Sequence, residues 1–292
     1  MKLYAQNWEK AHYTCYNYET IRDKAPFCLS AFFKIKKDRK FLNLVKAITF
    51  DFWQTIYIDN QELNIKRDEL RALKIWKYLT GIGHNNLRLE AVEQSVQIAN
   101  DFGLSLWYKG VVISIDNCVS EMGGFLGIPF NDAETHTITE IMGLATLETA
   151  PPLAPFIEIQ LPELAKKYRL GIVSDTGLTS AKFLRCLLLR DNIISYFTAL
   201  GFSDELGYSK PNPTIFQLTL QQLGAVSSES VHIGDLIQTD IYGAKRAGMR
   251  TIQYTNELGE KYTGKFKAEN QSLLPDAVIN NFCDIQLVIN DW

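Results

Sequence analysis

The sequence predicts an α/β fold, a Rossmann-like parallel sheet flanked by helices and interrupted by a small all-helical insertion. Residues 45–50 form an almost unbroken apolar run, which is typical of a strand buried on both faces. From residue 155 onward helical and strand patterns alternate, and this alternation is typical of βαβ units. Between these two regions the pattern is helical only, so we expect the insertion to separate the first strand from the second.

Composition excludes several classes of protein. Of the 292 residues 46% are hydrophobic and 22% are charged, as in an ordinary globular protein. The net charge of −3 gives no basic footprint for nucleic acid. The five cysteines are scattered without a CxxC pair, which favours a reducing compartment over a zinc site or a disulfide framework. No apolar run approaches the roughly 20 residues of a membrane span. We therefore expect a cytoplasmic protein with no nucleic-acid or membrane partner.

The domain boundaries follow from changes in pattern. Residues 1–44 show no clean periodicity and are expected to be an extension that is disordered in part or packs loosely. The α/β core is assigned to residues 45–59 and 150–292, and the helical insertion to residues 60–149. Helices are expected over 61–79, 86–109, 114–126 and 131–146, with Asn131 as an N-cap and Glu134 three residues later. Four helices with short connections indicate a small bundle.

The second part of the core contains helix and strand patterns in regular succession. Each predicted strand is short and apolar, and each predicted helix begins after a polar or proline-containing loop. The expected elements are a helix over 155–167, a strand over 168–173, a helix over 179–190, a strand over 198–202, a helix over 213–223, a strand over 231–233, a helix over 240–247, a strand over 250–254, and an edge strand over 276–279 followed by a short helix.

Polar residues follow three of the predicted strands. Asp51 ends the first, Ser174-Asp175 the second and Gly234-Asp235 a later one. In a parallel sheet these ends lie at one edge, where ligands bind. Each residue alone also has an ordinary explanation as a turn residue. Their joint placement favours a site.

The acidic residues of this predicted edge need a compensating charge. Asp51, Asp235 and Asp240 would form a carboxylate cluster that is unstable without a cation or a proton. Oxygen-only ligands of this kind suit Mg²⁺. Lys210, in the loop 208–213, would add a fixed positive charge. Taken singly, Asp240 is better explained as a helix N-cap and Lys210 as a solvated loop lysine, and only their joint placement reverses this preference.

At this point the residues resemble a known family, the haloacid dehalogenase-like hydrolase superfamily. The family's motifs are an apolar strand followed by D-x-D-x-T, a strand ending in Ser or Thr, a lysine often followed by proline, and G-D-x-x-x-x-D. The resemblance covers residues 46–290, and the insertion lies where the family carries its cap. The matching stretches are Asp51-Phe52-Trp53-Gln54-Thr55, Ser174, Lys210-Pro211 and Gly234-Asp235-Leu236-Ile237-Gln238-Thr239-Asp240.

The resemblance implies an activity and roles. The chain would be a Mg²⁺-dependent phosphohydrolase that acts on a small phosphorylated metabolite through an aspartyl-phosphate at Asp51. Thr55 and Ser174 would bind phosphoryl oxygens, with Asp175 beside them, and Lys210 would balance the charge of the nucleophile and the substrate.

The same resemblance implies a metal site. Mg²⁺ would be held by Asp51, the backbone carbonyl of Trp53 and Asp235, with Asp240 supporting from the outer side. Catalysis would then rest on positioning and electrostatic stabilisation of phosphoryl transfer.

Trp53 departs from the family pattern. Phosphatases of the family place an aspartate there as general acid and base, and an indole only donates a hydrogen bond. Three alternatives remain: a substrate with a good leaving group, a substitute acid such as Asp175 or a cap residue, or weak catalysis in a protein that serves binding or regulation. A 2-haloacid dehalogenase also lacks this aspartate, but the retained Gly234-Asp235 and Asp240 favour phosphorus over carbon.

Other polar residues are weaker candidates. His232 lies inside an apolar strand and is interpreted as a packed core histidine. In the predicted cap, Trp107-Tyr108, Lys66, Arg67 and Arg71 could face a substrate, although basic residues on exposed helices are common.

Overall fold

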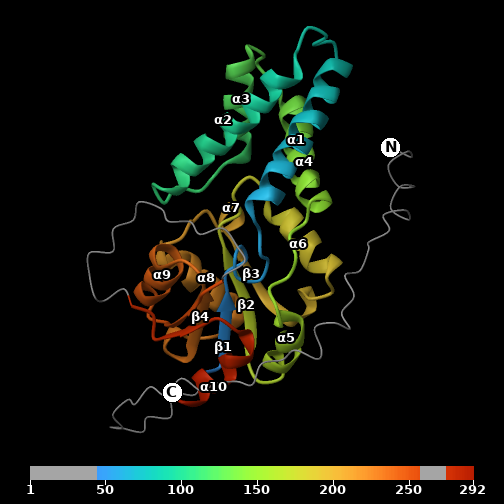
Figure 1. The fold of residues 1–292 in the computed structure, drawn as a ribbon. Helices are drawn as coiled ribbons and strands as arrows, with labels where there is room; N and C mark the ends of the chain where they lie inside the picture. The colour runs from blue at the N-terminus through green and yellow to red at the C-terminus, as the bar shows by residue number, and fades with distance from the viewer. Residues whose placement is uncertain (1–44, 257–273) are drawn as a thin grey trace, which may run out of the picture. The chain divides into compact units, whose positions relative to one another are not determined.

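The structure, a computed structural model, describes residues 45–256 and 274–292, so the expected extension at 1–44 lies outside the described residues. The core is a six-stranded sheet in which all paired strands are parallel, in the order β3-β2-β1-β4-β5-β6 (Figure 1). This is the predicted parallel α/β architecture. The strands are β1 (Ala47–Phe50), β2 (Arg169–Ser174), β3 (Phe197–Phe202), β4 (Ser230–Gly234), β5 (Arg250–Tyr254) and β6 (Ala277–Ile279).

Strand β1 lies in the middle of the sheet. All four of its residues are buried, as its apolar sequence predicts for a strand covered on both faces. Phe50 is in register with Ile172 of β2 on one side and Ile233 of β4 on the other. The carboxyl ends of these three strands therefore lie next to each other.

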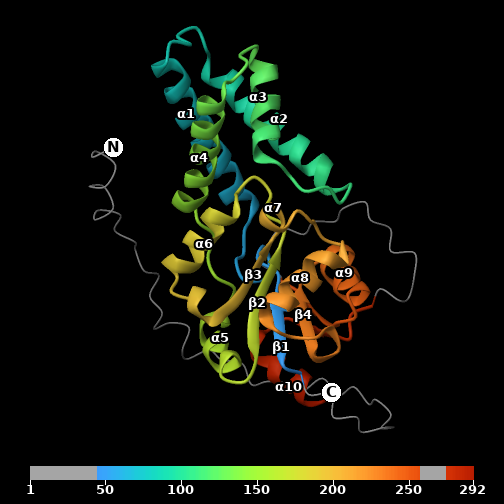
Figure 2. The ribbon, with the colours of Figure 1, turned by 180° about the vertical axis from the view of Figure 1, so that it is seen from behind.

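Helices cover both faces of the sheet. One face packs against α5 (Ile157–Ala165), α6 (Ala181–Arg190) and α10 (Ile285–Asn290), and the other against α8 (Pro213–Leu223) and α9 (Tyr242–Arg246). Figures 1 and 2 show α8 and α9 on one side and α5 and α6 on the opposite side. Alternation along β1 divides its side chains between the two layers: Ile48 and Phe50 join the first and Ala47 joins the second.

Four helices lie between β1 and α5 and contain a hydrophobic cluster of their own. Ile75, Val96, Met122 and Ile138, one from each helix, are buried in this cluster. The predicted capping box is present, because Asn131 and Glu134 exchange side-chain to backbone hydrogen bonds. The four helices are α1 (Gln61–Gly81), α2 (Leu89–Trp107), α3 (Ile115–Leu126) and α4 (Asp132–Glu148), and are called the inserted helices below.

The segment after β4 differs from the prediction. A regular helix was expected to start at Asp240, but residues Ile237–Ile241 form a π-helical turn and α9 begins only at Tyr242. A short helix that was not predicted, α7 (Ser203–Leu206), follows β3. Hydrophobic periodicity does not distinguish a wide turn from a regular one, because both bury the same apolar residues.

Candidate active site

The carboxyl ends of β1, β2 and β4 border a cavity of about 440 Å³. Asp51, Ser174, Lys210 and Asp235 all line it. Carboxylate oxygens of Asp51, Asp235 and Asp240 lie within 4.8 Å of one another. The structure thus brings the predicted strand-end residues together at one edge of the sheet.

Lys210 joins two of these carboxylates. Its Nζ lies 2.6 Å from Asp51 Oδ1 and 2.6 Å from Asp240 Oδ1, and its side chain is buried. Burial opposes the charged form, but the carboxylates of Asp240, Asp51 and Asp175 outweigh it and raise the pKa of Lys210 above its usual range. The ammonium is therefore a permanent charge, and two of its three N–H donors are used within the protein.

Asp240 is held by protein donors from several directions. The Leu236 amide donates to Oδ2 at 3.0 Å, and His232 Nε2 lies 3.3 Å from Oδ1. Burial raises the pKa of Asp240, but Lys210 and His232 more than offset it and hold that pKa below its usual range. Asp240 is thus an ionised acceptor that positions Lys210 from behind.

His232 completes this support. It is fully buried, as expected for a core histidine, and burial lowers its pKa despite the nearby Asp240. In the neutral form with the proton on Nε2, the ring donates to Asp240 while Nδ1 accepts from the Thr49 hydroxyl 2.9 Å away. Thr49 was not predicted as part of the site. The available signal was a hydroxyl two residues before Asp51, on the same face of an otherwise apolar strand.

Gly234 has a steric role in its motif. A Cβ atom at this position would lie 2.4 Å from Asp240 Cγ. The glycine therefore lets the aspartate six residues later fold back over the end of β4. This explains the spacing of Gly234 and Asp240 in physical terms.

Asp51 and Asp235 are the two carboxylates of the cluster whose negative charge the surrounding protein groups balance only in part. Burial raises the pKa of Asp51 to about 7, with Asp240 adding to the effect and Lys210 opposing it. Burial and the charges of Asp240 and Asp51 raise the pKa of Asp235 well above its usual range. Lys210 and the residue's own backbone amide oppose this shift only in part. This oxygen-only donor set fits a hard divalent cation, which would offset the repulsion.

Asp175 holds the loop that carries Lys210. One of its oxygens accepts from the Ser209 hydroxyl at 2.9 Å and from the Lys210 amide at 3.0 Å. The other accepts from Trp107 Nε1 at 2.9 Å. Burial raises the pKa of Asp175. The side chain lines the cavity as expected, but both oxygens are engaged, so it acts as an anchor between the loop and α2.

The turn after β1 sets the orientation of Trp53. Gln54 adopts a left-handed backbone with φ of 59°, and its amide donates to the Tyr57 carbonyl at 2.7 Å. The Trp53 side chain is half-buried and lines the cavity. Thr55 was expected to bind a phosphoryl oxygen, but it is fully buried and is not part of the cavity wall. Its hydroxyl has no hydrogen-bond partner within residues 45–256 and 274–292.

The inserted helices supply the opposite wall. Arg67, Arg71 and Trp107 line the cavity, as the sequence suggested, whereas Lys66 and Tyr108 are exposed outside it. Arg67 forms a two-point ion pair with Asp59 at 2.7 and 3.2 Å, and Arg71 pairs with Asp68 at 3.0 Å. Their charges are therefore balanced by the protein.

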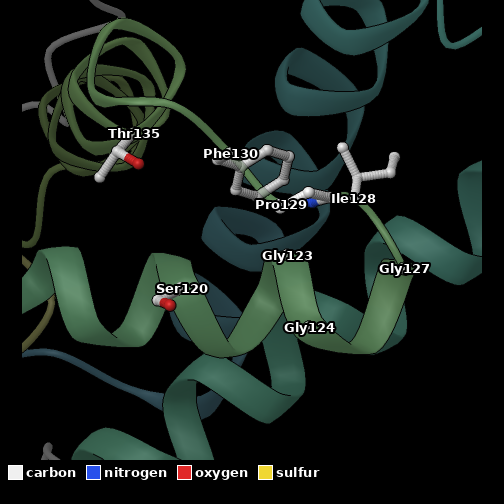
Figure 3. A pocket seen from close by; sticks show the side chains of 8 residues that line it. All are labelled: Ser120, Gly123, Gly124, Gly127, Ile128, Pro129, Phe130 and Thr135. Atoms are coloured by element: carbon white, nitrogen blue, oxygen red, sulfur yellow. The ribbon is translucent and has the colours of Figure 1, made fainter.

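A second hollow of about 390 Å³ is formed by α3, α4 and the loop between them (Figure 3). Gly123 and Ser120 of α3 face Phe130 and Thr135 across it. None of the residues that line it carries a charge. It lacks the convergent polar groups of the strand-end cavity, which we therefore take as the functional site.

Comparison with known proteins agrees with the motifs. Residues 130–254 match the family described as Haloacid dehalogenase-like hydrolase. A curated relative, the glyceraldehyde 3-phosphate phosphatase of Methanothermobacter thermautotrophicus, is 38% identical over 96 residues, which are 33% of this chain and 41% of the relative. That of Methanocaldococcus jannaschii is 22% identical over 259 residues, covering 85% of this chain and 98% of the relative. The chain spans 41% to 44% of the first curated relatives it matches.

Solved structures share the fold. A 2-haloacid dehalogenase from Pseudomonas syringae pv. Tomato DC3000 superposes with a TM-score of 0.61 at 21% identity, covering 85% of this chain and 100% of that one. A HAD-hydrolase from Bacillus subtilis, bound to magnesium, gives a TM-score of 0.56 at 16% identity, covering 85% and 99%.

The parallel sheet with acidic groups at its carboxyl edge defines an α/β protein with a carboxylate-lined site. Residues 130–254 match the haloacid dehalogenase-like hydrolase family, and the fold as a whole is shared with the solved structures named above.

Proposed function

We propose that the chain is a Mg²⁺-dependent phosphohydrolase that acts on a small phosphorylated metabolite. The observation that carries this proposal is the contact of Lys210 Nζ with both Asp51 and Asp240 at 2.6 Å, next to Asp235, whose negative charge is balanced only in part. This arrangement provides a nucleophile, a fixed cation and a place for a divalent cation. The similarity to relatives named glyceraldehyde 3-phosphate phosphatase supports the same reaction class.

Each residue has a defined part in the proposed reaction. An Asp51 carboxylate oxygen attacks phosphorus, the ester oxygen leaves, and water then attacks phosphorus of the aspartyl-phosphate to release inorganic phosphate. Lys210 holds Asp51 in place and balances the charge on the phosphoryl oxygens. The Ser174 hydroxyl at the end of β2 donates to one of these oxygens.

The metal would be held by Asp51, Asp235 and the backbone carbonyl of Trp53, with Asp240 supporting through Lys210. When bound, Mg²⁺ supplies positive charge to the phosphoryl oxygens and favours the ionised forms of Asp51 and Asp235. The raised pKa values of these two carboxylates support the assignment, because a cation there removes the cause of the shift.

Trp53 limits the range of substrates. General acid–base help is worth about 10²–10⁴-fold, and the indole provides none. Asp175 is poorly suited as a substitute, because three donors engage its oxygens. The proposed enzyme therefore acts best on phosphates with good leaving groups, such as acyl or aryl phosphates.

A 2-haloacid dehalogenase is the second candidate, and the lack of an acid at Trp53 favours it. That reaction attacks carbon and requires no metal, so it leaves Asp235 without a purpose. A binding or regulatory protein with little turnover is the third candidate, and the lack of an acid at Trp53 favours it as well. The retained carboxylate set makes the phosphohydrolase the better-supported reading.

The setting of the activity is part of the proposal. The inserted helices would act as the cap that covers the substrate, and residues 45–59 with 150–292 as the catalytic core. None of the helices in the described part of the chain is long and apolar enough to cross a membrane. We propose a cytoplasmic enzyme without nucleic-acid or membrane partners, in keeping with Cys118, Cys186 and Cys283 being free thiols.

A phosphate-release assay tests the proposal. Wild-type protein with Mg²⁺ is expected to hydrolyse acetyl phosphate or p-nitrophenyl phosphate, and Asp51→Asn and chelator are each expected to abolish turnover. Beryllofluoride with Mg²⁺ should form an adduct at Asp51. Halide release from a 2-haloacid that is insensitive to chelator, with no phosphate release, would replace this proposal by the dehalogenase reading.

A further inference from the structure

The cavity wall formed by the inserted helices carries two arginines, Arg67 and Arg71, whose positive charges are balanced by carboxylates of the protein. Arg67 donates from Nε and Nη2 to Thr149, from Nη1 and Nη2 to Asp59, and from Nη1 to Asn64. These five bonds use all five guanidinium donors. Arg67 therefore has no donor left for a substrate anion.

The guanidinium of Arg71 is also bound by protein groups. Its Nη1 donates to Asp68 at 3.0 Å, and its other bonds reach the Met142 carbonyl and the hydroxyls of Thr146 and Thr179. Asp68 balances its charge, and the second Asp68 oxygen accepts from Asn100 Nδ2 at 2.7 Å. The Asp68 side chain is 31% exposed, so the wall presents a carboxylate more openly than it presents the buried guanidinium.

The charges of the residues that line the cavity also disfavour a second anionic group on the substrate. Its lining, as far as the structure describes it, contains five carboxylate side chains but only three cationic ones, Arg67, Arg71 and Lys210. Lys210 is shared between Asp51 and Asp240. A divalent cation would balance the two charges of one phosphate monoester, and no positive charge would be left for a second anionic group.

The uncharged polar groups of the wall suit hydroxyls. Asn64, Gln97 and Asn100 line the cavity near Asp68, and amide and carboxylate groups together donate to and accept from an alcohol. A hydroxyl finds partners here without bringing a charge. A carboxylate would meet Asp68 instead, and burying an unpaired charge is costly.

We propose that the site preferentially binds phosphate compounds whose organic part is neutral and bears hydroxyl groups, and rejects those with a carboxylate or a second phosphate. This inference rests on the proposed phosphohydrolase function and adds a substrate class to it. Asp68 is the residue that sets the selectivity, acting through direct repulsion and through neutralisation of Arg71.

A matched ligand pair tests the inference. Glycerol 3-phosphate and 3-phosphoglycerate differ in one terminal group, a neutral CH₂OH against a carboxylate. Calorimetry on Asp51→Asn with Mg²⁺, at fixed free-metal concentration, is expected to show at least about tenfold tighter binding of glycerol 3-phosphate, equivalent to about 1.4 kcal/mol. Competition by the same pair against acetyl phosphate hydrolysis by the wild type gives a second measurement that does not depend on folding of the variant.

Two further variants locate the cause. Asp68→Asn, made in the same Asp51→Asn background, is expected to reduce the preference at least threefold, because it frees the charge of Arg71. Glu69→Gln removes the same charge from the adjacent, exposed residue outside the cavity and is expected to leave the preference unchanged.

The outcomes are separable. Absence of turnover with a retained binding preference would reject the phosphohydrolase while supporting the selectivity. Equal binding of the two ligands, tighter binding of 3-phosphoglycerate, or no binding of either overturns the inference, as does an equal effect of Asp68→Asn and Glu69→Gln.

Discussion

Trp53 lies at the position where the haloacid dehalogenase-like phosphatases that the motifs resemble carry the aspartate that delivers a proton. Its ring packs edge-on against Phe52, with centroids 5.0 Å apart, and borders the cavity beside Asp51. The side chain thus contributes an apolar surface where an acid is expected. In the proposed reaction, the absence of an acid at this residue would make turnover depend on the leaving group.

Trp53→Asp is therefore expected to raise turnover of alkyl phosphates such as glycerol 3-phosphate. The gain should be at least about tenfold, since a well-placed general acid contributes about 10²–10⁴-fold. Acetyl phosphate, whose leaving group needs little protonation, should gain less. Steady-state kinetics on both substrates measures the difference. Trp53→Phe is the control, and a similar gain in that variant would attribute the effect to space in the cavity.

Gly234→Ala tests the steric reading of the fourth motif. The added methyl carbon would lie 2.4 Å from Asp240 Cγ, so the aspartate must move and Lys210 loses a partner. We expect a loss of about 1–3 kcal/mol in the free energy of unfolding, together with a large loss of activity. Urea unfolding of Gly124→Ala provides the control, because a Cβ there meets no atom within 4 Å. Equal stability of the two variants would contradict this account.

The sequence identified the residues that end strands but missed those that support them. Asp51, Ser174 and Asp235 were predictable because parallel strands end at one edge. Thr49 and Ser209 were not, because their partners, His232 and Asp175, are distant in the chain. A hydroxyl in a strand or a loop gives no sign of its partner until the register of the strands is known.

At the scale of elements, Arg67 ties together the two segments that connect the core with the inserted helices. Asp59 lies in the segment before α1 and Thr149 in the segment after α4, and the buried guanidinium bonds to both. This side chain therefore joins the two segments, in addition to the backbone hydrogen bond from the Ile58 amide to the Pro152 carbonyl.

Arg67→Ala should lower the free energy of unfolding by about 3–5 kcal/mol, because it leaves Asp59 buried without its partner. Arg88→Ala removes an arginine from an exposed ion pair with Glu90 and should cost less than about 1 kcal/mol. Chemical denaturation monitored by circular dichroism compares the two. A loss for Arg67→Ala no greater than that for Arg88→Ala would show that the two connecting segments are held by other contacts.

The elements themselves were largely predictable, and the exceptions have a common cause. Helix α8 begins and ends where Pro213 and Gly224 indicate, since both residues have strong positional preferences. The helix predicted over 240–247 starts at Asp240, but that residue lies inside the π-helical turn Ile237–Ile241 and α9 begins at Tyr242. The width of this turn depends on Asp240 reaching back to the Leu236 amide, a contact that periodicity does not encode.

At the scale of the whole molecule, the site links stability to pH and to metal. In the metal-free protein the folded-state pKa values of Asp51 and Asp235 lie above their ordinary values. Their protonated forms are favoured by folding, so this contribution is complete at low pH and is lost as the pH rises from about 4 through about 7 for Asp51. His232 acts in the opposite direction below about pH 6.5, because folding favours its neutral form.

Mg²⁺ should therefore raise the melting temperature more at about pH 8 than at about pH 5, where protons compete for the same carboxylates. In chelator, Asp51→Asn should gain stability relative to the wild type as the pH rises over this interval. Differential scanning fluorimetry with and without chelator measures both effects. A metal effect independent of pH, or an unchanged difference between variant and wild type, would contradict the assignment.

The central place of β1 has a consequence for how the protein is made. Thr49 and its partner His232 are 183 residues apart, so a ribosome adding about 5–20 residues per second needs on the order of ten seconds or more to deliver the second after the first. During that time β1 first lacks both of its neighbours, and after the synthesis of β2 it still lacks β4. Helices α1 to α4 are synthesised in the same interval and have a hydrophobic cluster of their own. Asp51 is among the first residues of the site to be synthesised, and its surroundings are complete only after β4 has been synthesised.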